Sequence, residues 1–149
     1  MRVLFVCLGN ICRSPTAESV FRHLAEKNAK PWIFDSAGTS DNHVGEASDP
    51  RSIRHAHRRG YEMTHSARQF AQQDFDIFDL ILVMDKNNYQ DVIRLANEQA
   101  AKKVKLVTDY CQQENPGHVP DPYYGGDRDF EAVLDLLEDA ALGFFQKHK

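Results

Sequence analysis

The residues best suited to chemistry lie near the start of the chain, where an arginine follows a cysteine with five residues between them. The stretch reads Cys7-Leu8-Gly9-Asn10-Ile11-Cys12-Arg13-Ser14. Glycine lets a backbone approach a ligand closely, and asparagine tolerates the left-handed conformation of a tight turn. The arginine offers a planar fork of N–H donors that matches two phosphate oxygens. The stretch therefore predicts an anion site with a nucleophilic sulfur beside it, although Cys-x5-Arg alone is a weak pattern.

The flanking residues indicate how this loop is positioned. Residues 3–6 form a short, unbroken apolar run, typical of a strand buried on both faces. Ser14, Pro15 and Glu18 are typical of a helix start, with a hydroxyl N-cap, proline at the first position and acid in the first turn. The Ser14 hydroxyl is also expected to point at the Cys7 sulfur. Cys7 then ends a strand just before a helix N-terminus, where N–H groups and the helix dipole favour anions and thiolates. The alternative is that Cys7 is a small buried hydrophobe at a strand end.

The loop resembles the active-site loop of the low-molecular-weight protein tyrosine phosphatases, which reads Cys-x-Gly-Asn-x-Cys-Arg-Ser followed by Pro. A second family motif stands far along the chain, at Asp121-Pro122-Tyr123-Tyr124-Gly125-Gly126. Residues 35–40, 65–69 and 83–85 also look like family segments in family order. The resemblance covers essentially the whole chain. It implies a cysteine-dependent phosphatase that needs no metal or other cofactor.

The pattern of apolar residues predicts an α/β fold. Strands are expected at residues 3–6, 33–36, 80–84 and 104–108, and helices at residues 15–28, 50–59, 86–97 and 129–147. This alternation favours a three-layer arrangement: a four-stranded parallel sheet with helices on both faces and a phosphate-binding loop after the first strand. We expect one domain over residues 1–149. Ligands of such sheets bind at the carboxyl ends of strands, where Cys7 lies.

Composition places the chain among ordinary globular proteins, with 42% hydrophobic and 27% charged residues. No apolar stretch approaches the ~20 residues of a membrane span, and we expect neither a signal peptide nor a membrane partner. Three cysteines suit a reducing compartment, so we expect a cytoplasmic protein. A net charge of −4 argues against nucleic acid as a partner. The basic residues between Arg51 and Arg59 are interpreted as the solvated face of a short helix, or else as a surface that steers anionic phosphopeptides.

The second catalytic candidate is Asp121, in the pattern-free stretch of residues 109–128; loops of this length are usually functional. Expelling a tyrosine-like oxygen near neutral pH calls for a proton donor. The resemblance implies that Cys7 attacks phosphorus, Arg13 holds the phosphate oxygens, and Asp121 serves as general acid and then as general base. The simpler alternative is that Asp121-Pro122 only opens a turn.

The resemblance also implies roles for residues around these three. The substrate-binding residues expected are Leu8, Gly9, Asn10, Ile11, Cys12, Ser14, Asn42, His43, Tyr123 and Tyr124. Asn10, Ser36 and His65 are expected to form a hydrogen-bond network that holds the loop, although His65 alone would be an ordinary histidine. Cys12 is expected to trap an oxidised Cys7 as a reversible disulfide, or to be a buried packing residue, and Cys111 to be structural. Neither the histidines nor the cysteines have zinc-ligand spacing, and no nucleotide-binding Gly-x4-Gly-Lys motif is present.

Several features distinguish this chain from its relatives. Asn42 stands where the family usually has an aromatic residue, which predicts weaker gripping of a phosphotyrosine ring unless His43 compensates by stacking. Protein arginine phosphatases resemble the chain too but typically have Thr in place of Ile11, so phosphotyrosine is favoured. Arsenate reductases need cysteines around residues 76–92, and that segment has none. A non-catalytic phosphotyrosine-binding module is the other alternative. The partners expected are tyrosine-phosphorylated proteins, with an autophosphorylating tyrosine kinase as one candidate.

Overall fold

The computed structural model describes residues 1–113 and 115–149. At its centre all strands of one sheet run parallel, in the order β2-β1-β3-β4. The strands are β1 (Arg2–Cys7), β2 (Ile33–Gly38), β3 (Leu80–Val83) and β4 (Val104–Leu106). The expected four-stranded parallel sheet is confirmed.

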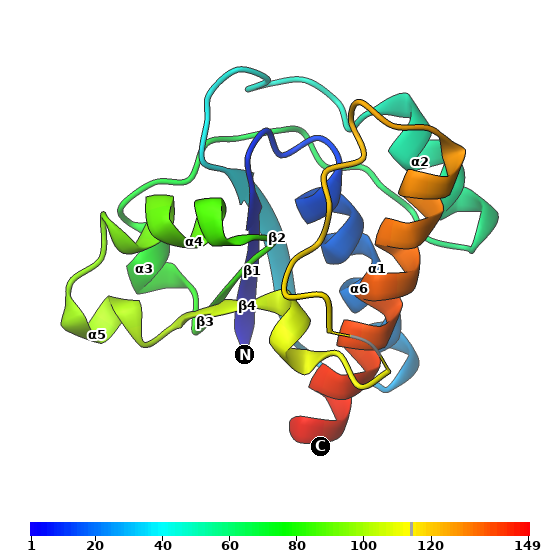
Figure 1. Ribbon diagram of the computed structural model, residues 1–149. Helices are drawn as coiled ribbons and strands as arrows, with labels where there is room; N and C mark the ends of the chain where they lie inside the picture. Colours follow the sequence, from blue (N-terminus) through cyan, green and yellow to red (C-terminus); the bar gives the residue numbers. More distant parts are fainter. Residues whose placement is uncertain (114) are drawn as a thin grey trace.

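Helices cover both faces of this sheet, which confirms the three-layer α/β arrangement (Figure 1). On one face lie the two long helices, α1 (Arg13–Lys27) and α6 (Asp127–Lys147), and α2 (Pro50–Arg58) packs beside α6. On the other face lie α3 (Asp74–Ile77), α4 (Lys86–Ile93) and α5 (Glu98–Ala101). A 3₁₀ helix, η1 (Val107–Tyr110), follows β4 and packs against α6.

The central strand β1 is buried on both faces, as its unbroken apolar run predicts. Val3 and Phe5 pack with α1 and α6, and the ring centroid of Phe5 lies 4.6 Å from that of Phe21. Leu4 and Val6 point the other way, into the core formed with α3 and α4. Alternate residues thus hold both layers to the strand that ends in Cys7.

The start of α1 differs from the expectation. The helix begins at Arg13 and its N-cap residue is Cys12, which makes no side-chain cap hydrogen bond. The prediction that Ser14 is the N-cap was wrong, because the helix already begins at Arg13. The expected contact of the Ser14 hydroxyl with the Cys7 sulfur is confirmed, at 3.0 Å. Glu18 was wrongly expected in the first turn; that turn has no acidic residue, and Glu18 faces His65 from deeper in the helix.

Other elements are shorter or divided. The helix expected at residues 86–97 ends at Ile93, and the Asn97 side chain accepts from the backbone N–H of Ala100 to begin α5. The strand expected at residues 104–108 ends at Leu106, because the chain turns into η1. The helix α3 was not expected. No helix among the described residues has the length and apolar character that a bilayer span requires.

The carboxyl ends of the strands gather several loops at one edge of the sheet. Cys7 at the end of β1 pairs with Gly38 at the end of β2. From the far end of the chain, the Val119 N–H donates to the Met84 carbonyl just after β3, over 2.7 Å. The pattern-free stretch is therefore brought to the same edge as Cys7; within it, Glu114 lies outside the described residues.

Candidate active site

The loop of residues 8–12 forms a backbone cradle between β1 and α1. Asn10 adopts a left-handed conformation, with φ of 58°, which reverses the chain direction. Among the described residues, no protein acceptor is found for the backbone N–H groups of Leu8, Gly9, Ile11 and Cys12. Unpaired N–H groups beside a helix N-terminus attract anions, because the aligned peptide dipoles leave positive charge there.

The sulfur of Cys7 receives two polar contacts from the same segment. The backbone N–H of Asn10 donates to Sγ over 3.3 Å, and Ser14 Oγ lies 3.0 Å from Sγ. Ser14 Oγ accepts from the Asn10 side-chain amide at 2.8 Å, and its own proton has two acceptors within reach, the Cys7 sulfur at 3.0 Å and the Ala37 carbonyl at 3.4 Å. Hydrogen-bond donors aimed at a cysteine sulfur stabilise the thiolate, which is the nucleophilic form.

Arg13 is nearly fully buried at the start of α1, with only 3% of its surface exposed. Its Nη1 donates to Asp85 Oδ2 at 2.7 Å and to the Val119 carbonyl at 3.0 Å. Burial opposes the charge of Arg13, but Cys7, Asp85 and Asp121 outweigh this effect and raise its pKa. Within the described chain, Nε and Nη2 form no hydrogen bond, so these donors remain available for an anion.

Asp121 faces Arg13 from the loop that precedes α6. Its Oδ2 lies 3.9 Å from Arg13 Nη2, and its Oδ1 accepts from the backbone N–H of Tyr123 at 3.1 Å. The side chain is 42% exposed, so the carboxyl group can exchange protons with water. An acid on a loop opposite the cradle can deliver a proton to a group bound between the two.

These residues enclose one cavity of about 180 Å³. It is lined by Cys7, Leu8, Gly9, Ile11, Cys12, Arg13, Ser40, Asn42, His43, Asp121, Tyr123 and Tyr124. Most of the residues expected to bind substrate therefore meet at one place. Asn10 and Ser14 do not line the cavity, because their side chains lie behind the sulfur. Ser40 does line it and was missed; its buried Oγ has no protein partner among the described residues.

Behind the sulfur, polar side chains form a connected network. The Asn10 amide nitrogen donates to Ser14 and Ser36, and its carbonyl oxygen accepts from the His65 ring at 2.8 Å. Ser36 in turn donates to Glu18 at 2.7 Å. The structure thus brings Asn10, Ser36 and His65 together, and it adds Glu18, for which the sequence has no local signal of this role.

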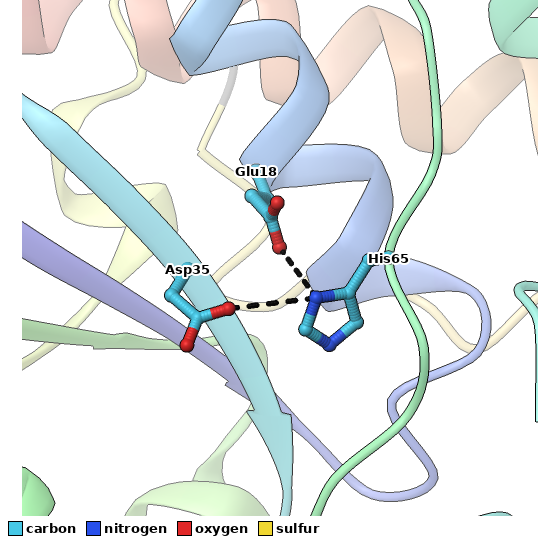
Figure 2. A group of neighbouring side chains, drawn as sticks. All are labelled: Glu18, Asp35 and His65. Carbon is cyan, nitrogen blue, oxygen red and sulfur yellow. Dashed lines mark ion pairs between the residues drawn. The ribbon is translucent and has the colours of Figure 1, made fainter. Parts of the chain in front are cut away.

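Figure 2 shows two carboxylates, Glu18 on α1 and Asp35 on β2, that face the same nitrogen of the His65 ring. His65 Nδ1 lies 3.2 Å from the Glu18 oxygen and 3.4 Å from the Asp35 oxygen. Nε2 contacts the Asn10 carbonyl oxygen, so Nδ1 is the ring nitrogen that faces both carboxylates. Glu18, Asp35 and His65 are also the group among the described residues that could hold a metal ion, with ligand atoms within 4.8 Å of one another.

All three cysteines are free thiols. Cys12 lines the cavity with Cys7, and burial raises its pKa to about 12. Cys111 is half-buried beside η1, and its sulfur points at the Leu136 carbonyl at 3.7 Å.

The two sides of the cavity mouth carry different kinds of side chain. Tyr123 and Tyr124 form one side, and Tyr124 is 92% exposed. On the other side Asn42 is exposed, and the ring of His43 lies 6.3 Å from the Tyr123 ring. His43 Nδ1 also contacts Glu46 at 3.1 Å. An imidazole ring therefore stands close to the place where the family usually has an aromatic residue.

The basic cluster on α2 is less solvated than expected. His55 is buried between Asp127 and Glu131, and Arg59 pairs with three acidic residues of α6. The hydrogen bonds that Arg59 donates to these carboxylates, together with their negative charge, outweigh burial and raise the pKa of Arg59. The interpretation as one solvated face was wrong for these two residues, because their acidic partners come from α6, which is distant in sequence.

Comparison with known proteins agrees with this geometry. Residues 2–149 match the family model described as low molecular weight phosphotyrosine protein phosphatase. The chain belongs to this family. A Synechocystis protein is 49% identical over 146 residues, an alignment that covers 94% of this chain and 91% of the relative. The low molecular weight phosphotyrosine protein phosphatase of Sus scrofa is 43% identical, with 97% of this chain and 94% of the relative covered.

Solved structures of the family superpose closely on this phosphatase-family chain. The protein tyrosine phosphatase of Entamoeba histolytica, with Hepes in its active site, has a TM-score of 0.97 and 40% identity, with 99% and 96% of the two chains covered. The Drosophila arginine phosphatase has a TM-score of 0.94 and 32% identity, with 100% and 98% covered.

Proposed function

We propose that this protein is a protein-tyrosine phosphatase that hydrolyses phosphotyrosine through a phosphocysteine intermediate. The observation that carries the proposal is the meeting of three groups on one cavity: the sulfur of Cys7, the guanidinium of Arg13 and the carboxyl group of Asp121. Next to the sulfur, the backbone N–H groups of Leu8, Gly9, Ile11 and Cys12 have no protein acceptor among the described residues and are available to a phosphate. A nucleophile, an anion cradle and a facing acid are the parts that hydrolysis of an aryl phosphate requires.

In the first step the Cys7 thiolate attacks phosphorus. The S–P bond forms while the P–O bond to the tyrosine oxygen breaks, and Asp121 gives its proton to that oxygen. The cradle N–H groups and Arg13 hold the remaining phosphate oxygens, where negative charge is spread in the transition state. Asp85 and the Val119 carbonyl fix Nη1 of Arg13, which orients the rest of the guanidinium toward the cavity.

In the second step water hydrolyses the phosphocysteine. Asp121, now a carboxylate, takes a proton from the water whose oxygen attacks phosphorus. The new P–O bond forms as the S–P bond breaks, which releases phosphate and restores the thiolate. Ser14 and the Asn10 N–H contact the sulfur at 3.0 and 3.3 Å and stabilise the negative charge that returns to it.

Phosphotyrosine is favoured over phosphoarginine as the substrate. The relatives named above include both a tyrosine phosphatase and an arginine phosphatase. Ile11 lines the cavity with an apolar side chain, and the arginine phosphatases of the family typically have a threonine hydroxyl there. An apolar wall suits an aromatic ring better than a charged guanidinium group.

The partners that follow are tyrosine-phosphorylated proteins, and an autophosphorylated tyrosine kinase is one candidate. We infer a cytoplasmic location, which the three free cysteines support. Over-oxidation of Cys7 would be limited by a disulfide with Cys12, which lines the same cavity.

The proposal is tested by phosphate release from peptides that contain phosphotyrosine, phosphoserine or phosphoarginine, with a chelator present and Cys7→Ser as the control. Turnover of phosphotyrosine that Cys7→Ser abolishes is expected. Binding of the phosphopeptide without turnover would instead support a binding module, and preference for phosphoarginine would overturn the substrate assignment.

A further inference from the structure

One arginine outside the loop that holds Asp121 (residues 120–126) donates hydrogen bonds to the backbone of this loop. Arg51 Nη2 donates to the Tyr123 carbonyl at 2.9 Å, and Nη1 reaches the Gly125 carbonyl at 3.5 Å. Among the described residues, no other side chain outside the loop donates to the backbone of residues 120–126. The remaining hydrogen bonds of this backbone are local, such as that from Gly125 N–H to the Pro122 carbonyl at 2.9 Å.

Arg51 is itself held firmly. Its Nε and Nη2 donate to the two carboxylate oxygens of Asp49, at 3.1 and 3.0 Å. The guanidinium carbon lies 4.6 Å from the Phe130 ring centre and 5.7 Å from that of Tyr123, so the planar group also makes cation–π contacts. Burial alone would raise the pKa of Asp49, but the hydrogen bonds from Arg51 outweigh it and lower that pKa. The pair is therefore charged throughout the neutral range.

Asp49 connects this pair to the phosphate cradle. Its backbone N–H donates to the Ile11 carbonyl at 2.8 Å, and its carboxylate caps α2 by accepting from the Arg51 N–H at 2.8 Å. A continuous path of hydrogen bonds thus runs from Ile11 through Asp49 and Arg51 to Tyr123. It joins the loop that binds phosphate to the loop that supplies the acid.

We propose that Arg51 is a positioning residue that sets the place of the Asp121 carboxyl group over the cradle. The inference rests on the proposed function, because it matters only where Asp121 donates a proton. Arg51 does not line the cavity and does not touch the reacting atoms. Arg51 acts through Tyr123, which lies two residues after the acid. The Tyr123 carbonyl accepts from Arg51, and the Tyr123 N–H donates to Asp121 Oδ1. Proton transfer is sensitive to displacements of this kind, since the acid must lie within hydrogen-bond reach of the leaving oxygen.

The test is the dependence of kcat/KM on the leaving group in the variant Arg51→Met, which keeps length and loses every donor. The substrates are a series of aryl phosphates whose leaving groups range from p-nitrophenol, a good one, to unsubstituted phenol, a poor one. We expect a loss of about tenfold or more for phenyl phosphate and about twofold or less for the nitrophenyl ester, because a good leaving group needs little protonation. The matched control is Arg54→Met on the same helix, whose side chain is 50% exposed and lies 3.8 Å from Asp127. It should leave both values unchanged.

A structural defect would lower both rates together, so the split between leaving groups separates positioning from misfolding. Placed in the variant Asp121→Asn, Arg51→Met should cause no further loss for phenyl phosphate. An equal loss in the presence and absence of Asp121, or an unchanged leaving-group dependence in Arg51→Met, would overturn the inference. The proposed function fails separately: in that case the wild type itself would be inactive or would be unaffected by Asp121→Asn.

Discussion

Removal of the Asn10 side chain is expected to destabilise the protein strongly. This side chain is 1% exposed and takes part in four hydrogen bonds. Its amide nitrogen donates to Ser14 and Ser36, at 2.8 and 3.0 Å. Its oxygen accepts from the His65 ring and from the Arg68 backbone N–H, at 2.8 and 3.0 Å. The backbone of Asn10 is also left-handed, with φ of 58°.

The magnitude follows from the groups that Asn10→Ala would leave without partners. Ser14 and Ser36 keep other partners, but His65 Nε2 and the Arg68 N–H lose their acceptor. Each unsatisfied buried donor costs about 1–3 kcal/mol. Alanine in the left-handed region adds roughly 1 kcal/mol. The sum is about 3–7 kcal/mol, a large share of the ~5–15 kcal/mol typical of a domain.

Urea unfolding at neutral pH measures this loss. Asn10→Gly separates the two contributions, because glycine removes the backbone strain but not the missing acceptor. It should be more stable than Asn10→Ala by about 1 kcal/mol. The matched control is Asn87→Ala, an exposed position on α4, which should change stability by no more than about 0.5 kcal/mol. If Asn10→Ala lowered the free energy of unfolding by less than about 1 kcal/mol, the reasoning would be refuted. The two donors that lose Asn10 would then have found other hydrogen-bond acceptors at little cost.

Three further outcomes are expected. Asn42→Tyr should lower KM for aryl phosphates in steady-state assays, because a second ring would then face the substrate; an unchanged or higher KM would contradict this. Since burial raises the pKa of Cys12 to about 12, iodoacetamide at pH 7 should leave it unlabelled in folded Cys7→Ser protein and label it after unfolding, as peptide mass mapping would detect. The hydrogen bond from Arg59 lowers the pKa of Glu131, so this carboxylate contributes stability that is complete above its unfolded value of about 4.3 and is lost as pH falls through the lower folded value. The Tm of Arg59→Met should therefore change less between about pH 5 and pH 3 than the Tm of the wild type. Equal slopes of Tm against pH in the two proteins would disprove the coupling.

The sheet and the cradle could be predicted from the sequence because their signals are local. The buried run of β1, the loop after it and the helix pattern behind it occupy one short segment. The exact start of α1 could not be predicted, because the Ser14 hydroxyl has two uses. A local pattern favours it as an N-cap, but the tertiary structure places it against the Cys7 sulfur at 3.0 Å.

Contacts between distant segments could be predicted only where the family resemblance implies them, as for Asn10, Ser36 and His65. Asp85 orients Arg13, and Glu18 joins the network of His65, yet each looks locally like an ordinary helix-start acid. The Arg51 side chain likewise reads as part of a basic surface until the loop of residues 120–126 folds against it. Pairing across tens of residues is determined by the packing of α2, α6 and β3, which a single sequence does not encode in any short pattern.

The most direct test of the central claim is a rapid denaturing quench during turnover of p-nitrophenyl phosphate, followed by mass spectrometry of the peptide that contains Cys7. A good leaving group makes formation of the intermediate fast relative to its hydrolysis. We expect a burst of p-nitrophenol matched by a phosphoryl group on Cys7, with neither seen in Cys7→Ser. A phosphoryl group on another residue, or continued turnover with Cys7 unmodified in every sample, would contradict the account.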